Sequence, residues 1–334
     1  MFESYMRVNS LAFKHLPLAI LLVNASLLAG GQKIWAEEKT DLIFVANEDS
    51  ASISVIDGEA KEVTSTLQVD EGPHNLALSP DRRFLLVTHP SRDKVTIIET
   101  KARRVRSKFP FQGKPHGVAF APDGRSAYLA LEGRSKLLVI EPESGVIKSE
   151  VSLERPPHNV VVSPGGEFVW VTSLGSNLLW VIDSKTNSVL RRIPTEGSPH
   201  DLVISSRDEG VWVTNWQSST LFFLEPFSGG TPRIFSVMTA GKVPHHLALT
   251  PNGEEVWISN HRSDDVTVVD AISRKELVRI PVGKRPHHVV ISPDGRRAYV
   301  ANSESNDVTI IDAIDKKVIG RVLVGRGPHG IVAK

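Results

Sequence analysis

The sequence predicts an all-β fold, a seven-bladed β-propeller, from three observations: a repeat of 42 residues, four strand-like runs in each copy, and no sustained helical period. The repeat is clearest at a proline-histidine pair, which recurs at intervals of 42, 42, 42, 45, 42 and 42 residues. The histidines of these pairs are His74, His116, His158, His200, His245, His287 and His329. An interval this constant indicates one structural unit repeated around a ring.

Each copy of the repeat is expected to form four antiparallel strands. The last full copy starts at Pro286 and holds four short runs rich in Val, Ile and aromatic residues. Between its first two runs, Ser292-Pro-Asp-Gly295 is typical of a type I turn, with proline at the second position and glycine closing it. Four strands in each copy match one propeller blade.

The two ends of the repeated region predict how the ring closes. Only three strand-like runs precede His74, and only one, 330–333, follows His329. We therefore expect the last strand to pair with the first three and complete the seventh sheet. Such a closure joins the chain ends without a disulfide and removes exposed sheet edges.

The first 36 residues differ from the repeats and predict a signal peptide. Arg7 and Lys14 precede an apolar run over 16–28, which is too short to span a bilayer, and cleavage is expected after Ala36. Translation starts at Met1 or at Met6. The predicted organisation is a cleaved signal peptide over 1–36 and a single propeller domain over 37–334, in a periplasmic or secreted protein.

The composition excludes several classes of chemistry. The chain has no cysteine, which rules out disulfides, thiol catalysis and a cysteine-linked lipid anchor. Lys and Arg number 39 and Asp and Glu 38, so no overall field attracts nucleic acid. The strongest basic run, from Lys101 to Lys108, is expected on a solvated outer edge, with an anionic partner site as the alternative.

The second strand of several copies resembles a known repeat family. Phe44-Val-Ala-Asn47, Trp212-Val-Thr-Asn215 and Tyr299-Val-Ala-Asn302, with the Ser-Pro-Asp-Gly turns, resemble the YVTN-type β-propeller repeat of exported bacterial and archaeal proteins. The resemblance covers residues 41–334. It implies a seven-bladed propeller in a family of cell-surface and periplasmic binding proteins. Similar propellers among lactonases, antibiotic lyases and partners of alcohol-oxidation systems keep an enzyme function open.

Two repeated positions are expected to be structural. One position of the second strand is always large and should fill the space between blades: Phe44, Leu86, Tyr128, Trp170, Trp212, Trp257 and Tyr299. The third strand always ends in a carboxylate, which is expected to cap the backbone of the next turn: Asp57, Glu99, Glu141, Asp183, Glu225, Asp270 and Asp312. We predict no catalytic residue.

The seven histidines of the pairs are the candidate site. The first strand of a blade lies nearest the propeller axis, so the seven imidazoles should form a ring at one mouth of the central channel. Three or four of them could hold Zn or Cu, because imidazole is the commonest metal ligand. The alternative is structural: each histidine could bond a carbonyl of the neighbouring blade.

One sector of the ring is the preferred site. His200, His245 and His287 are followed by the potential ligands Asp201, His246 and His288. Because neighbouring strand residues point in opposite directions, a His-His doublet is not expected to direct both rings at one ion without distortion. The loops after the second strands should add a rim of His89, Arg92, Arg134, Trp216, His261 and Arg262.

These patterns predict a binding or scaffold protein whose histidine-ringed mouth takes a metal, a small ligand or a protein partner. The chain is expected to be a monomer with no membrane span and no nucleic-acid partner. The first alternative is a metal-dependent enzyme, a hydrolase, a lyase or a propeller associated with an oxidoreductase, that uses ring histidines. The second alternative is a surface-adhesion or nucleic-acid-binding propeller.

Overall fold

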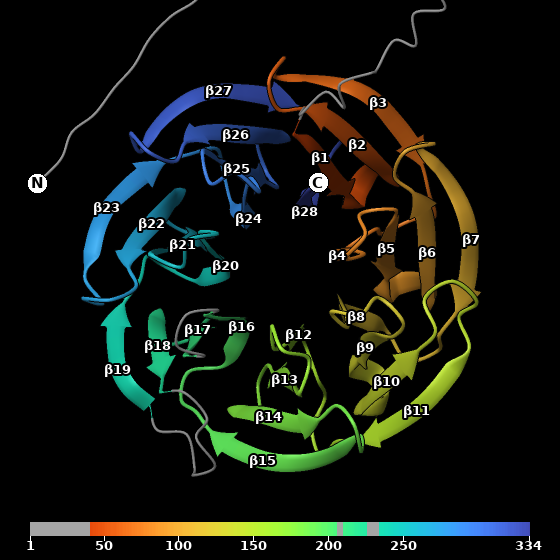
Figure 1. The fold of residues 1–334 in the computed structure, drawn as a ribbon. Helices are drawn as coiled ribbons and strands as arrows, with labels where there is room; N and C mark the ends of the chain where they lie inside the picture. Colours follow the sequence, from red (N-terminus) through yellow and green to blue (C-terminus); the bar gives the residue numbers. More distant parts are fainter. Residues whose placement is uncertain (1–40, 206–209, 226–233) are drawn as a thin grey trace, which may run out of the picture. The chain divides into compact units, whose positions relative to one another are not determined.

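The computed structural model describes residues 41–205, 210–225 and 234–334. In these ranges, 28 strands form seven four-stranded antiparallel sheets arranged around a common centre (Figure 1). The predicted seven-bladed β-propeller is confirmed. The predicted signal peptide, its cleavage after Ala36 and the choice between Met1 and Met6 lie outside the described residues.

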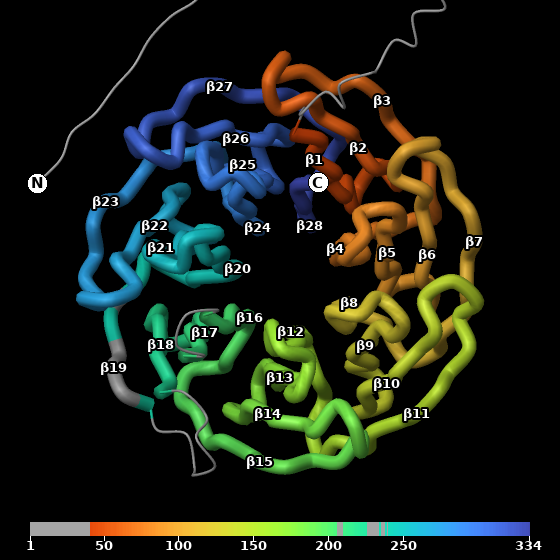
Figure 2. The backbone as a smooth tube through the Cα atoms, in the orientation of Figure 1, coloured from red at the N-terminus to blue at the C-terminus, as the bar shows by residue number. Residues whose placement is uncertain are grey.

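Every blade runs from an innermost strand to an outer edge strand, as the backbone trace shows (Figure 2). The innermost strands are β28 (Pro328–Ala333), β4 (Leu76–Leu78), β8 (Pro115–Phe120), β12 (Val160–Val162), β16 (Pro199–Ile204), β20 (Pro244–Leu249) and β24 (Pro286–Ile291). The second strands are β1 (Leu42–Asn47), β5 (Phe84–His89), β9 (Ala127–Leu131), β13 (Phe168–Ser173), β17 (Val211–Asn215), β21 (Glu255–Asn260) and β25 (Arg297–Asn302).

The third strands are β2 (Ser52–Asp57), β6 (Lys94–Glu99), β10 (Lys136–Ile140), β14 (Leu178–Asp183), β18 (Thr220–Leu224), β22 (Asp265–Asp270) and β26 (Asp307–Asp312). The edge strands are β3 (Glu62–Gln68), β7 (Arg104–Pro110), β11 (Ile147–Ser152), β15 (Ser188–Pro194), β19 (Ile234–Thr239), β23 (Glu276–Pro281) and β27 (Lys317–Leu323). Three short 3₁₀ turns follow second strands: η1 (Glu48–Ser50), η2 (Pro90–Arg92) and η3 (Glu132–Arg134). Among these elements, none is a helix of the length and hydropathy needed to cross a membrane.

The ring closes as the sequence predicts. The last strand, β28, pairs antiparallel with β1, and Val45 lies opposite Ile331. Outside the ladder, the backbone N–H of Glu48 donates to the carbonyl of Gly327 (2.9 Å), and that of Lys334 to the carbonyl of Leu42 (2.8 Å). One blade therefore holds both ends of the propeller together.

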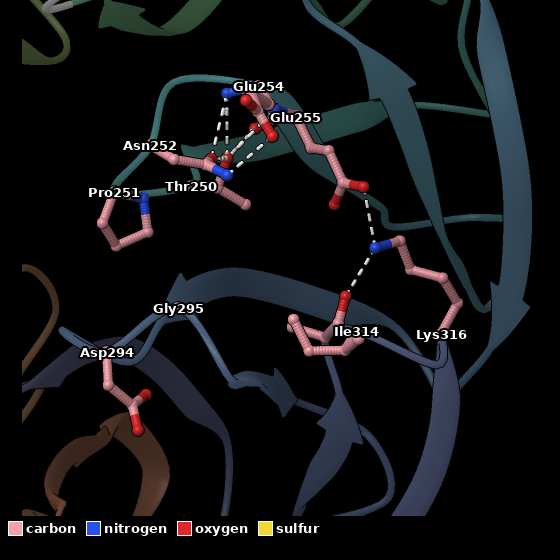
Figure 3. Close-up of a pocket in the computed structure, with 10 residues that line it drawn as sticks. Thr250, Pro251, Asn252, Glu254, Glu255, Asp294, Gly295, Ile314 and Lys316 are labelled. Carbon is pink, nitrogen blue, oxygen red and sulfur yellow. Dashed lines mark hydrogen bonds and ion pairs between the residues drawn. The ribbon is translucent and has the colours of Figure 1, made fainter.

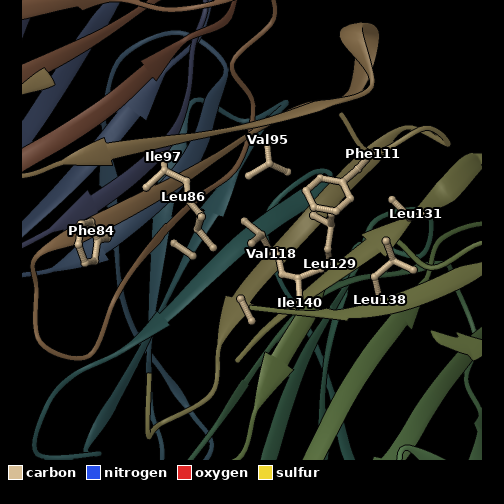
Figure 4. Close-up of a cluster of buried hydrophobic side chains, with 12 residues drawn as sticks. Phe84, Leu86, Val95, Ile97, Phe111, Val118, Leu129, Leu131, Leu138 and Ile140 are labelled. Atoms are coloured by element: carbon tan, nitrogen blue, oxygen red, sulfur yellow. The ribbon is translucent and has the colours of Figure 1, made fainter. Parts of the chain in front are cut away.

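The hydrophobic core lies between the blades. One cluster joins Leu86 and Ile97 of one blade to Leu129 and Ile140 of the next (Figure 4). The large residues of the second strands are all buried, with 3% exposure or less, as expected. Burying a side chain of this size contributes roughly 1.5–3 kcal/mol, so adjacent blades are held firmly against each other.

Four of the seven turn carboxylates, all aspartates, cap the backbone as the sequence predicts, whereas Glu99 and Glu141 bind the side chains of Arg104 and Ser144. Asp57 Oδ1 accepts the backbone N–H groups of Glu59 and Ala60, each at 2.9 Å. Asp183, Asp270 and Asp312 cap the corresponding turns in the same way. Their oxygens serve the fold and do not form an acid-base pair.

His89 takes the place of the asparagine that ends the second strand in other blades. In the last blade, Asn302 Nδ2 donates to Thr309 Oγ1 (2.9 Å). The Nε2 of His89 lies 2.9 Å from the equivalent Thr96 Oγ1, and its Nδ1 lies 3.1 Å from the carbonyl of Glu71. His89 is fully buried, and burial lowers its pKa to about 4. The predicted rim residue thus lies inside its blade.

We predict that His89→Asn makes the protein more resistant to acid. The folded state resists protonation of His89 until about pH 4, whereas the unfolded chain takes up the proton near pH 6.5. The stability that depends on neutral His89 is complete above pH 6.5 and decreases as the pH falls toward 4. Urea unfolding should therefore give similar free energies for both proteins at pH 7.5, and an advantage of about 2 kcal/mol for the variant at pH 5. An equal difference at both pH values would contradict this.

Candidate functional site

The proline-histidine step begins five of the seven innermost strands, where it carries a local irregularity, and lies just before the other two, β4 and β12. The register of β20 against β21 shifts between Pro244 and Leu247, and that of β24 against β25 shifts between Pro286 and Val289. The strands β8, β16 and β28 shift at the same step. A bulge redirects the side chains next to it. The repeated Pro-His pair is therefore where the strand is bent to present its histidine.

The structure brings all seven histidines of the pairs into one closed ring. The ring centroids of adjacent members lie 3.6–4.5 Å apart, from His74 and His116 round to His329 and His74. The innermost strands that carry them surround the centre of the propeller (Figure 1).

Hydroxyl groups of the second strands hold the histidine backbones in place. Thr214 Oγ1 donates to the carbonyl of His245 in the next blade (2.8 Å) and accepts the N–H of Asp201 in its own blade (3.2 Å). Thr88, Thr172 and Ser259 donate to the equivalent carbonyls of His116, His200 and His287. At four of the seven junctions between blades, a threonine or serine hydroxyl thus bonds the backbone of the histidine in the next blade.

The Nδ1 atoms of six ring histidines divide into those with and those without a hydrogen-bond partner. The Nδ1 of His116 donates to the carbonyl of His158 (3.0 Å), and the Nδ1 of His200 donates to that of His245 (3.1 Å). For these two histidines the structure shows the bond to a neighbouring blade that the structural alternative requires. In contrast, four other ring members have a buried Nδ1 with no hydrogen-bond partner in the described part of the chain: His74, His245, His287 and His329.

The ring is neutral at physiological pH. Burial lowers the pKa of all seven histidines, and neighbouring imidazoles lower it further. The pKa falls to about 3 for His116 and His158. A neutral imidazole keeps one nitrogen lone pair, which is the form that binds a metal ion.

The preferred sector of the sequence analysis contains a compact group of donors. One ring nitrogen each of His200, His245 and His246 lie within 4.8 Å of one another, and all three residues are buried. A His-His doublet is expected to bring both rings together only if the strand is distorted, and the strand is distorted here. The bulge at Pro244 changes the strict alternation of the strand on which that expectation rested.

Asp201 fixes the orientation of His246. The Nδ1 of His246 lies 2.7 Å from Asp201 Oδ2, and both side chains are less than a tenth exposed. The carboxylate also accepts the side-chain amide of Asn159 and the backbone N–H of Leu247. Because a carboxylate only accepts, Nδ1 of His246 carries a proton, and in the neutral ring this leaves Nε2 unprotonated.

His287 is not among these three donors, although its ring centroid lies 3.7 Å from that of His245. It belongs to a second group with His288 and His329.

After four of the second strands, the first residue of the loop lies at the ring: Glu48, Glu132, Trp216 and His261. Trp216 lies 5.1 Å from His200 and 5.2 Å from His245, and His261 lies 5.0 Å from His287, between ring centroids. Glu132, at the same repeat position, binds the Nδ1 of His158 (2.6 Å). The predicted rim included Trp216 and His261 but missed Glu132 and Glu48. Aligning the copies one residue beyond the second strand would have found both.

The predicted rim arginines do not point to one site. Arg92 pairs with Glu71, and Arg134 donates to Gln112 (3.1 Å). Arg262 is exposed. A different arginine, Arg285, reaches the mouth and donates to His261 Nε2 (3.1 Å).

Two features away from the histidine mouth are less suited to binding. A cavity of about 370 Å³ lies between the turn at Pro251 and the turn at Ile314, on the opposite face (Figure 3). Its Lys316 is paired with Glu255 (2.7 Å), and its Asp294 accepts hydrogen bonds within its own turn. The basic run on β7 is likewise paired, Arg104 with Glu99, Arg106 with Glu143 and Lys108 with Asp70.

The fold is matched by two family models. The model of "Lactonase, 7-bladed beta-propeller" matches residues 23–226, more than half of the chain. The chain belongs to this family of seven-bladed lactonase propellers. A second model, "YNCE-like beta-propeller", matches residues 256–326.

Solved structures share the fold of this family member at low sequence identity. Hydrazine synthase of Kuenenia stuttgartiensis is 22% identical over 80% of this chain and 91% of its own, with a TM-score of 0.72. The periplasmic gluconolactonase of Pseudomonas aeruginosa is 21% identical over 88% and 98%, with a TM-score of 0.74. A functionally unknown protein of Desulfotomaculum acetoxidans is 14% identical over 88% and 99%, with a TM-score of 0.77. Comparison with curated proteins gives no match.

We predict that Thr214→Ala destabilises this lactonase-family propeller by about 1–3 kcal/mol, because the N–H of Asp201 and the carbonyl of His245 each lose a buried partner. Ser218→Ala, at an exposed hydroxyl of the same blade, is the control and should change stability little. Chemical unfolding of the three proteins measures the effect. Equal stability of the two variants would show that these bonds do not hold the ring.

Proposed function

We propose that this propeller is an exported protein that binds a divalent transition metal ion, Zn²⁺ or Cu²⁺, through His200, His245 and His246. The ion would be the point at which the histidine mouth takes its ligand or partner. The observation that carries the proposal is the buried contact between His246 Nδ1 and Asp201 Oδ2 (2.7 Å).

A carboxylate behind a histidine is the usual arrangement around a bound metal. It holds the ring in one orientation, fixes the proton on the far nitrogen and makes the near nitrogen a better ligand. For His200, the backbone carbonyl of His245 plays the same role, because it accepts a hydrogen bond from the Nδ1–H of His200 (3.1 Å). Two of the three donors thus have their unprotonated Nε2 set by a hydrogen bond on the other side of the ring.

The donor set suits the proposed ions. Imidazole nitrogens favour Zn, Cu and Ni over the hard ions Mg and Ca. Three histidines leave one position open on a tetrahedral ion, and a bound ion there supplies a Lewis acid. Trp216 beside His200 and His245 would form the wall of the open position.

Export to the periplasm belongs to the same proposal. It is supported by the apolar run over 16–28 with its two preceding basic residues. The solved gluconolactonase of Pseudomonas aeruginosa, which has the same fold, is a periplasmic protein. The second strands that end in Asn47, Asn215 and Asn302 support placement among the YVTN-type repeats.

We predict that Asp201→Asn weakens Zn²⁺ binding by about 10–100-fold while the propeller stays folded, since Asp201 acts on the ion only through His246. His246→Ala should abolish the site. Asp183→Asn, at a turn cap of the neighbouring blade, is the matched control and should bind like the wild type. Untagged protein is stripped with a chelator and titrated with Zn²⁺ against a chromophoric competitor. The proposal fails if the wild type takes up no ion or if all four proteins bind alike.

A second candidate function is metal-dependent hydrolysis of a lactone. Membership in the lactonase propeller family and the open coordination position favour it. We predict that Zn-loaded protein opens sugar lactones in a pH-stat assay and that the activity is lost with a chelator and in His246→Ala. Activity that survives both treatments would separate hydrolysis from the metal site, and no activity across aldonolactones of five- and six-membered rings would leave the binding function alone.

A further inference from the structure

Next to the site at His200, His245 and His246, the histidine mouth holds a second group of donors that this site does not use. One ring nitrogen each of His287, His288 and His329 lie within 4.8 Å of one another. The two groups share no residue. We propose that this second group is a separate transition-metal site, so that the histidine mouth binds two ions.

The unpaired nitrogens of this group are the main argument. The Nδ1 atoms of His287, His288 and His329 are all buried and have no hydrogen-bond partner among the described residues. His329 is only 6% exposed. A buried polar atom without a partner costs about 1–3 kcal/mol, and a fold seldom leaves three of them side by side. One ion bound by the three rings would give each a partner.

The three donors of the second group are all imidazole nitrogens. Asp201 and Glu132 lie at His246 and His158, and Glu48 lies in a further group with His74 and His329. The proposed second site uses imidazole donors only, a set that suits Zn²⁺ and Cu²⁺.

The two sites are neighbours. The rings of His246 and His288 are stacked with their centroids 3.1 Å apart, and those of His245 and His287 lie 3.7 Å apart. Two Cu²⁺ ions held on either side of these contacts are close enough for their unpaired electrons to interact.

Metal counting tests the second site separately from the first. Untagged, chelator-stripped protein is equilibrated with Zn²⁺, passed over a desalting column and measured for metal and protein. We expect two equivalents for the wild type, one for His288→Asn, one for His246→Asn and none for the double variant. His89→Asn is the control, because His89 lies inside its blade and belongs to neither group, and should keep two.

A wild type with one equivalent that His288→Asn retains overturns the second site and leaves the proposed function standing. A wild type with none overturns both. Circular dichroism confirms folding, and His287→Asn replaces His288→Asn if that variant unfolds.

Electron paramagnetic resonance gives an independent readout. Wild type loaded with two Cu²⁺ should show a dipolar-broadened spectrum, and His288→Asn the sharp spectrum of an isolated ion. Identical spectra of isolated Cu²⁺ in both would also overturn the second site.

Discussion

The pairing of β28 with β1 is the contact on which the rest of this structure depends. It joins the last strand of the chain to the first blade, so that seven separate sheets become a closed ring. Closure brings the ring centroid of His329 to 3.6 Å from that of His74 and completes the circle of imidazoles. Without this pairing the first and last blades would carry unpaired strand edges, and the mouth would lose its continuity.

The ring of histidines costs stability that a simpler propeller would not lose. Seven imidazoles are buried against each other, and several keep a buried nitrogen with no partner in the described chain. Apolar or hydroxyl side chains in these places would pack without that penalty. Local rules of good packing are broken mainly where function requires it, and here they are broken at the same step in four of the seven blades. In the proposed function, a metal ion would bond the nitrogens that the described chain leaves unpaired.

Much of this account could be predicted from the sequence because it follows from spacing. The interval between the Pro-His pairs determines the number of blades, and the three strands before His74 determine the closure. The position of the large residues, from Phe44 to Tyr299, predicts the packing between blades.

What could not be predicted depends on bulges and on contacts between blades. Strict alternation separated His245 from His246, and the bulge at Pro244 brought their nitrogens to the same place. Asp201 and His246 belong to different blades and lie 45 residues apart in the sequence, so no local sequence pattern indicates that they pair. His89 looked like a rim ligand because only the structure shows that it substitutes for an asparagine inside its blade. The central claim remains chemical: the mouth binds metal. Anomalous diffraction at the zinc edge, from crystals of untagged protein grown with Zn²⁺, tests it most directly. The account predicts a peak about 2.0–2.1 Å from nitrogens of His200, His245 and His246. A map with zinc only at the outer surface, and none at the histidine mouth, would contradict it.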